Sequence, residues 1–359
     1  MKMRRHLFPA GIRCLFWSMK GKDMRGRRTD RRKNCISVLV LCVAFLLTAC
    51  KGGSSGLRLG TGDEGGTYYT YSTHMSELLK PDPDLQIKTT AGSVANLRLM
   101  KKDFLDLSIV QSDILARDSQ EDAENVSYSA VAGLYTEALQ IVVRQDSGIR
   151  EVEDLKGRTV SLGEEESGVR KNAEEVLRMA GIKESDVDQR YLSFTDSAAL
   201  FKEGKLDAFF VMAGVPTKAV ENLAKDTKIR LISISEDAIR FLKNLNPEYT
   251  ECTIPAGCYE GQDEEVRTVG VRAVLVVSNS VGSSEVKKLT EKILSCSGEL
   301  NREILTDDVL TPEAAAEKVP IPFHPGAAEY LKEQGVEVQV ASVKTASGVF
   351  GGQDEGGAK

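Results

Sequence analysis

The strongest constraint on the fold is the alternation of short apolar strands with helices after residue 56. The first part of this region predicts three strands, at 57–60, 85–90 and 106–110. Two helices separate them, one at 67–79 and one that begins near Ser93. A strand–helix–strand order is typical of a parallel sheet, because a parallel crossover needs a helix-length connection. We therefore expect an α/β fold.

The same alternation resumes further along the chain and predicts a second α/β unit. Its strands are expected at 139–144, 158–163, 189–194, 207–214 and 230–235, with helices at 168–180, 197–202 and 216–225. The run TVGVRAVLVVS at 268–278 is apolar over most of its length and contains a single charged residue, an arginine. Such a run predicts a central strand buried on both faces. Two more helices are expected at 283–294 and 311–317.

The distribution of charge argues against a nucleic-acid partner. The net charge is −6, but residues 1–49 hold 12 Lys+Arg and 2 Asp+Glu, and the rest of the chain holds 35 and 51. Binding to phosphate backbones needs a basic face. Only His74 and His324 lie beyond residue 49, which also argues against a histidine-based metal site. We expect no metal and no cofactor.

The first fifty residues read as an export signal. A basic segment at 25–33 precedes the uncharged run ISVLVLCVAFLL at 36–47, which is too short to span a bilayer as a stable helix. The run ends in LTAC at 47–50, which resembles a bacterial lipobox. That resemblance implies cleavage before Cys50 and acylation of this residue, with 1–49 as the signal peptide. The alternative is an ordinary signal peptide with a coincidental cysteine. KGGSSG after Cys50 makes 50–56 a flexible tether.

Three cysteines remain beyond Cys50. An exported compartment permits disulfides, and the segment CTIPAGC could join Cys252 to Cys258 in a small loop. The alternative is two free thiols, and Cys296 is expected to be buried.

Two glycine-rich turns resemble nucleotide-binding loops, but neither fits one. GTGDEG at 60–65 matches GxGxxG, yet it places Asp63 and Glu64 where pyrophosphate would lie. GEEESGVR at 163–170 nearly matches a phosphate-binding loop, but Val169 replaces the lysine and three glutamates fill the loop. The plainer interpretation is a turn whose following helix is capped by Ser167.

Polar side chains cluster at turns that follow predicted strands. They include Thr67 to Tyr69, Ser93 with Asn96, Gln111 to Asp113, and Ser167. Ser93 is also a plausible helix N-cap. No pairing of a nucleophile with a base accompanies these residues, whereas ligands commonly bind after the carboxyl ends of strands. The pattern indicates a polar ligand cleft and no enzyme.

Several longer segments, in order, resemble one family. GDEGGTYYTYSTHMSELL (62–79), AGSVANLRLMKKDFLDLSIVQSD (91–113), LYTEALQIVVRQDSGIREVEDLKGRTVSLG (134–163), DAFFVMAGVPTKAV (207–220), IPAGCYEGQ (254–262) and PFHPGAAEYLKEQG (322–335) are similar to the TAXI group. These are solute-binding proteins of tripartite ATP-independent periplasmic (TRAP) transporters. The resemblance covers about residues 57–335.

The resemblance implies a two-lobe, type II periplasmic-binding-protein-like α/β fold with a hinge, closing on a small organic anion or amino acid such as glutamate or 2-oxoglutarate. It also implies delivery to a TRAP-type membrane permease. By position, the ligand-binding residues would be Tyr68, Tyr69, Ser93, Asn96, Gln111, Ser167, Arg170, Gly214 and Tyr259.

The chain departs from the family in the second-lobe turn. Where members tend to have a GxPGSGTR-like run, this sequence has Glu166 in place of a glycine and Val169 in place of a threonine. An arginine can bind a carboxylate through two hydrogen bonds, so Arg170 is a candidate clamp; the alternative is a surface ion pair with Glu164, Glu165 or Glu166. The glutamates favour a monoanion or a zwitterion over a dicarboxylate.

We expect lobe I to comprise 57–138 plus 266–340 and lobe II to comprise 139–265, with crossings at 134–142 and 262–270 and a disordered tail at 341–359. The expected protein is exported and lipid-anchored, at the cell membrane or outer membrane, facing the periplasm or the exterior. Two rival functions remain at this stage: a ligand-binding sensor lipoprotein, and a periplasmic enzyme on the same scaffold.

Overall fold

A computed structural model describes residues 56–122, 126–303 and 310–342. Cys50, the signal segment and all but the start of the expected tail lie outside these residues. Within the described residues, no helix combines the length and the apolar composition that crossing a membrane requires.

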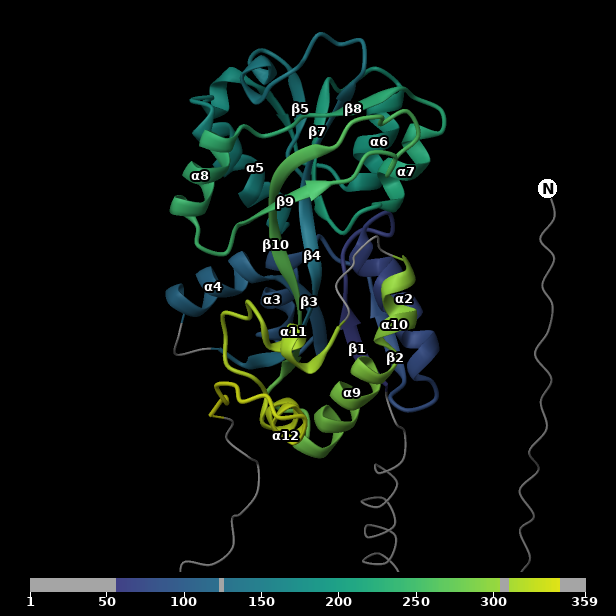
Figure 1. Ribbon diagram of the computed structural model, residues 1–359, viewed down its shortest axis with the longest axis vertical. Coiled ribbons are helices and arrows are strands. Elements are labelled where there is room, and N and C mark those ends of the chain that lie inside the picture. Colours follow the sequence, from purple (N-terminus) through teal and green to yellow (C-terminus); the bar gives the residue numbers. More distant parts are fainter. Residues whose placement is uncertain (1–55, 123–125, 304–309, 343–359) are drawn as a thin grey trace, which may run out of the picture. The chain divides into compact units, whose positions relative to one another are not determined.

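The body of the chain consists of two α/β lobes joined through one continuous sheet (Figure 1). The sheet has the strand order β2-β1-β3-β10-β4-β7-β5-β6, with β8 added to β4 and β9 added to β10. Strands β1, β2 and β3 run parallel in lobe I, and β5, β6 and β7 run parallel in lobe II. The predicted two-lobe α/β fold of type II periplasmic binding proteins is therefore confirmed.

Lobe I contains the strands nearest the amino end of the body and most of the helices from the carboxyl end. Its elements are β1 (Leu57–Gly60), α2 (Thr67–Leu79), β2 (Leu85–Lys88), α3 (Ser93–Met100), β3 (Leu107–Gln111), α4 (Ser112–Glu121), α9 (Ser283–Ser295), α10 (Ser297–Leu300), α11 (Pro312–Ala316) and α12 (Pro325–Glu333).

Lobe II is formed by the middle of the chain. Its elements are β5 (Thr159–Ser161), α5 (Gly168–Met179), β6 (Asp188–Arg190), α6 (Phe194–Lys202), β7 (Ala208–Ala213), α7 (Lys218–Ala224), β8 (Ile229–Leu231), α8 (Glu236–Leu245) and β9 (Thr250–Ile254).

Two long strands belong to both lobes. β4 (Tyr128–Arg144) and β10 (Val266–Ser278) pair antiparallel from Tyr128 opposite Ser278 to Ala138 opposite Gly270, with two register shifts. Figure 1 shows them running from the lower lobe into the upper one. Both are buried along nearly their whole length, so the prediction of a central strand at 268–278 is confirmed.

Each lobe has its own hydrophobic core. In lobe I, Leu59, Leu107 and Ile109 of the parallel strands pack with Tyr71 and Met75 of α2. In lobe II the alternation of β4 sends consecutive side chains to opposite faces. One face, including Ile141 and Val143, packs with α5 and α8, and the other, including Val142, packs with residues of α6 and α7. Separate cores leave the space between the lobes free for a polar site.

Most predicted elements occur in the structure, and the differences are local. β1 and α2 have the predicted bounds, while β4 begins eleven residues before the strand expected at 139. Among the α-helices and strands of the described residues, five were not predicted: α4, α8, β9, α10 and α12. Ser93 does not cap α3, whose N-cap is Gly92, since the Ser93 hydroxyl oxygen accepts a hydrogen bond from the Gln111 backbone N–H instead.

Gly270 generates a prediction about the strands that cross between the lobes. A Cβ at this position would lie 2.5 Å from the Glu137 backbone oxygen and 2.9 Å from Thr136 Cγ2. Because backbone atoms of a paired strand cannot move aside cheaply, Gly270→Ala should lower the free energy of unfolding by about 1–3 kcal/mol. Urea denaturation measures this change. The control is Gly282→Ala, where a Cβ would meet no atom within 4 Å; equal stabilities of the two variants would contradict the prediction.

Candidate functional site

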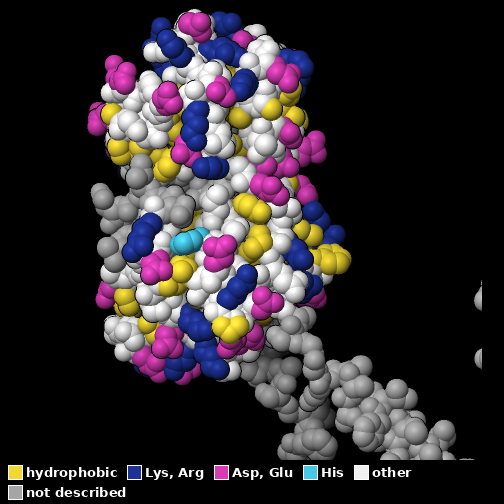
Figure 2. All heavy atoms as spheres, turned by 90° about the vertical axis from the view of Figure 1, so that its right-hand side faces the viewer, with side chains coloured by type: hydrophobic (Ala, Val, Ile, Leu, Met, Phe, Trp, Pro, Cys, Tyr) yellow, Lys and Arg dark blue, Asp and Glu magenta, His cyan; other side chains and the backbone are white. Residues whose placement is uncertain are grey.

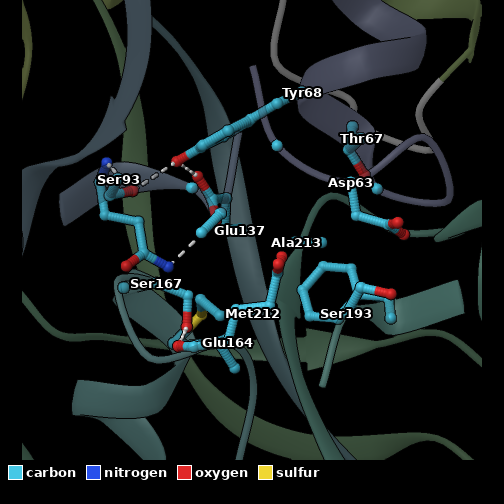
Figure 3. A pocket seen from close by; sticks show the side chains of 18 of the residues that line it. Asp63, Thr67, Tyr68, Ser93, Glu137, Glu164, Ser167, Ser193, Met212 and Ala213 are labelled. Carbon is cyan, nitrogen blue, oxygen red and sulfur yellow. Dashed lines mark hydrogen bonds between the residues drawn. The ribbon is translucent and has the colours of Figure 1, made fainter. Parts of the chain in front are cut away.

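A cavity lies between the lobes and is lined by residues of both (Figure 3). The space open to the centre of a water molecule is about 50 Å³, room for only a few waters. The lining residues are Gly62, Asp63, Gly66, Thr67, Tyr68, Ala91, Gly92, Ser93, Gln111, Glu137, Glu164, Ser167, Gly168, Val169, Leu192, Ser193, Phe194, Met212 and Ala213.

Four helices begin at the cavity. Their first residues, or the residues before them, are among its lining: Gly66 and Thr67 for α2, Gly92 and Ser93 for α3, Ser167 and Gly168 for α5, and Ser193 and Phe194 for α6. The unbonded N–H groups and the dipole of a helix give its N-terminus a partial positive charge. Two lobes therefore direct helix N-termini at one small space, an arrangement that suits a carboxylate.

Glu137 on β4 is the most deeply buried ionisable group of the lining, with 1% of its surface exposed. The Tyr68 hydroxyl donates to Glu137 Oε1 at 2.5 Å, and Gln111 Nε2 donates to Oε2 at 3.3 Å. Figure 3 shows the Tyr68 hydroxyl reaching both Glu137 and Ser93. Burial outweighs these hydrogen bonds and raises the pKa of Glu137 to about 8.

Gln111, at the end of β3, has an unused acceptor. Its side chain is buried with 3% exposed, and its Oε1 has no hydrogen-bond partner. A Cβ placed on Gly168 of lobe II would lie 1.6 Å from this oxygen. Gly168 therefore permits the close approach of α5 to Gln111, and the carbonyl oxygen faces the second lobe.

The charged side chains of the lining are all acidic. Asp63, Glu137 and Glu164 contribute to it, and none of the described lining residues is Lys, Arg or His. Burial, and then the charges of Asp63 and Asp196, raise the pKa of Glu164. The outer surface differs in charge from the lining of the cavity. On the face that Figure 2 presents, basic and acidic side chains are interspersed.

The lobes make direct contacts at the rim of this cavity. Arg98 of α3 forms two hydrogen bonds with the Glu166 carboxylate, at 2.8 and 2.6 Å, and the Ala95 N–H donates to the Glu166 carbonyl. Asp63 Oδ2 accepts hydrogen bonds from the Thr195 N–H and hydroxyl at the first turn of α6. We call these contacts of Glu166 and Asp63 the rim latch. They hold the structure in a closed conformation.

A second set of contacts joins the lobes away from the cavity. Asn172 of α5 donates to Asp113 of α4 at 2.8 Å and to the Tyr249 hydroxyl at 2.8 Å. Tyr249 in turn donates to Glu175, which also pairs with Arg117. Desolvation raises the pKa of the buried Asp113 carboxyl to about 7.

Four of the nine ligand-binding residues predicted from the sequence line the cavity: Tyr68, Ser93, Gln111 and Ser167. Ser167 also caps α5, since its hydroxyl oxygen accepts a hydrogen bond from the Arg170 N–H, which confirms the predicted cap.

Four others do not line the cavity, and three of these form hydrogen bonds within the scaffold. Asn96 donates to the carbonyls of Thr61 and Ile109, and its oxygen accepts from Thr90. The Tyr259 hydroxyl donates to Gln140 Oε1 and accepts from the Thr217 N–H. The Gly214 carbonyl accepts from the hydroxyls of Thr67 and Thr217. Tyr69 lies outside the lining.

Arg170 does not line the cavity in this structure, and its role as a ligand clamp stays a prediction. Its guanidinium donates to Glu174 Oε1 at 2.8 Å, one helical turn along α5, and lies over the Tyr191 ring. Arg170 does form an ion pair, as the alternative expected, but its partner is Glu174 and not one of the three preceding glutamates. Residues four apart are neighbours on a helix.

Cys252 and Cys258 are free thiols, and so is Cys296. The disulfide alternative for the CTIPAGC segment is therefore not realised. Cys252 lies in β9, where Cys252 pairs with Thr268 of β10.

Sequence reasoning missed Glu137, Glu164, Ser193, Phe194 and Met212 as lining residues. Glu137 had a usable signal: it is the only charged residue between Tyr128 and Val143, a run buried along almost all its length. A lone carboxylate in a strand buried on both faces needs a partner or a ligand.

A family model described as the NMT1-like family matches residues 59–335. Solved structures with similar folds include the alkanesulfonate-binding protein SsuA from Xanthomonas axonopodis pv. citri, with 17% identity, coverage of 77% of this chain and 83% of that chain, and a TM-score of 0.45. PhnD1 from Prochlorococcus marinus, in complex with methylphosphonate, has 15% identity, coverage of 70% and 89%, and a TM-score of 0.48.

A putative L-cystine ABC transporter protein from Listeria monocytogenes has 13% identity, coverage of 71% and 98%, and a TM-score of 0.45. At such identities and scores, the ligands of these proteins say nothing about the ligand of this chain.

The raised pKa of Glu137 predicts how stability depends on pH. Between the ordinary carboxyl pKa of 4.5 and about 8, the native state holds a proton that the unfolded chain has released. The contribution of Glu137 to stability therefore falls as pH rises through this range, by up to about 1.4 kcal/mol per pH unit. Glu137→Gln removes this titration, so its melting temperature should fall less than that of the wild type between pH 5 and 8. An equal fall in the melting temperatures of the two proteins between pH 5 and 8 would contradict the prediction.

Proposed function

Because the chain belongs to the NMT1-like family and closes two lobes over a polar cavity, we propose that it is an extracytoplasmic solute-binding protein. The observation that carries this proposal is the cavity lined by both lobes. A ligand there contacts both lobes only when they are closed, so it shifts the protein towards the closed conformation by differential affinity. Binding and release, without covalent chemistry, are the whole function.

The proposed ligand is a small organic anion or amino acid. The N-termini of helices from both lobes face the cavity and suit one carboxylate, whereas the acidic residues Asp63, Glu137 and Glu164 disfavour a second one. This charge balance favours a zwitterion over a dicarboxylate such as 2-oxoglutarate. Among the predicted residues, Tyr68, Ser93, Gln111 and Ser167 are those we propose as ligand contacts.

The proposed partner is a TRAP-type permease, and the proposed subgroup is the TAXI group. Support for both comes from the ordered motifs of the sequence, from GGTYY in α2 to FHPGA at the start of α12. The proposed location is outside the cytoplasm, with the lipid on Cys50 and the glycine- and serine-containing segment 50–56 linking it to the body.

Ligand binding should stabilise the purified protein against heat. A ligand present at 100 times its Kd adds about 2.7 kcal/mol to the free energy of unfolding, which raises the melting temperature of a chain this size by about 5 °C. A thermal-shift screen of amino acids and small mono- and dicarboxylic acids measures this. If no compound of these classes raises the melting temperature, the proposed ligand class is wrong.

The anchor makes a separate prediction. Cys50→Ser removes the thiol that would be acylated, so the variant should lose labelling by radioactive palmitate and move from the membrane to the soluble fraction. Cys258→Ser, which changes a thiol in the body of the protein, is the control and should keep both properties. Continued labelling of the Cys50 variant would contradict the proposed lipid anchor.

A further inference from the structure

Two hydroxyl groups that line the cavity already donate hydrogen bonds within the protein. The Tyr68 hydroxyl donates to Glu137, and the Ser167 hydroxyl donates to the Glu164 carbonyl, so both of these side-chain donors are already used. Burial raises the pKa of Glu137, but a cation bound beside it would favour the ionised form, which offers about four acceptor sites.

Gln111 provides an independent observation of the same kind. Its side chain lines the cavity, and its buried Oε1 has no partner, although its Nε2 donates to Glu137. A buried acceptor without a donor destabilises the closed protein, and a ligand that brings a donor relieves this. Gln111 and Glu137 are adjacent, so one donor group with several protons can satisfy both.

The charge of the lining decides what kind of donor this is. Asp63, Glu137 and Glu164 carry no basic counterpart among the described lining residues, so a cationic donor is favoured over a neutral hydroxyl. A metal ion is not the cation, because no group of three His, Cys, Asp or Glu side chains in the described parts of the chain is arranged to hold one. An ammonium group has three N–H donors and a positive charge.

We propose that Glu137 and Gln111 form an ammonium-binding subsite, and that the ligand is a small zwitterion with a protonated primary amine. This inference rests on the proposed solute-binding function and narrows its ligand class. The amine lies between Glu137 and Gln111 Oε1, and the carboxylate of the ligand faces the helix N-termini. The corresponding hydroxy acid lacks the charge and two of the three donors, so it leaves an acceptor unpaired.

The size of the cavity limits the side chain of this ligand. With space for only a few waters in the closed conformation, glycine, alanine or serine fits better than a long side chain. A side-chain carboxylate would also meet Asp63 or Glu164. The ligand class is therefore a small amino acid whose side chain carries no charge.

The test compares amines with hydroxy acids of the same carbon skeleton. Calorimetry at one pH and salt concentration measures the Kd of glycine, L-alanine, L-serine and L-glutamate, and of glycolate, L-lactate, L-glycerate and L-2-hydroxyglutarate. We expect each of the three small amino acids to bind more than tenfold tighter than its hydroxy acid, and L-glutamate to bind more weakly than L-alanine. Hydroxy acids that bind as tightly as the amines would overturn the inference while leaving solute binding intact.

Two variants locate the subsite. Glu137→Gln keeps the shape of the side chain without its charge, and Gln111→Met removes the unpaired acceptor; both should reduce the preference for the amine to less than threefold. Asp118→Asn is the matched control, since Asp118 is another carboxylate of lobe I that accepts from a tyrosine, Tyr128, and lies outside the cavity. A preference retained in both subsite variants would overturn the inference.

The failure of the proposed function gives a different result. If none of the eight compounds binds the wild-type protein, the proposed ligand class of amino acids and organic acids fails, and the ammonium subsite fails with it.

Discussion

The antiparallel pairing of β4 with β10 is the interaction on which both lobes depend. Every other strand of the sheet pairs with one of these two strands or is linked to one of them through one or two intervening strands. Because the pair is continuous from Tyr128 to Ala138 on one strand, the backbone hydrogen bonds that hold lobe I together are continuous with those that begin lobe II. Glu137 lies at the end of this pairing, opposite Val271, so the same strands that join the lobes place a carboxylate between them.

Burial on both sides explains why Glu137 behaves unlike an ordinary surface glutamate. The strand that carries it, β4, is buried along nearly its whole length, and its own hydrogen bonds come from one tyrosine and one glutamine. Neither donor carries a charge, so the negative charge is only partly compensated. The protein retains an incompletely paired acid at the position where its two halves meet, a position where stability alone would favour an apolar residue.

The α/β class could be predicted from the sequence because the relevant signals are local, whereas the two-lobe arrangement was expected only from the resemblance to a family. Alternating strands and helices, the apolar run at 268–278 and the Ser167 cap depend on neighbouring residues, and each occurs as predicted. The candidate site depends on contacts between distant residues. Ser93 and Ser167 line the cavity. Asn96 lies in the same helix turn as Ser93, but its amide donates hydrogen bonds to the backbone carbonyls of Thr61 and Ile109.

Contacts between distant residues also explain why the partners of the charged residues in the second-lobe turn, 163–170, were not predicted. Local spacing alone could have paired Arg170 with Glu174, while the partner of Glu166 is Arg98, 68 residues away, and no local pattern indicates it. The glutamate that departs from the resembling family's glycine thus has a role in the closed structure, as half of an ion pair between the lobes.

The rim latch bears on how long a bound molecule stays. Arg98 and Glu166 are each 43% exposed in their side chains, so salt and water weaken their attraction. In the proposed function, a latch of modest strength lengthens the residence time of the solute between the lobes and still allows the lobes to reopen. A membrane partner that offers a competing charge to Arg98 or Glu166 would shorten that residence time and so determine when the ligand is released.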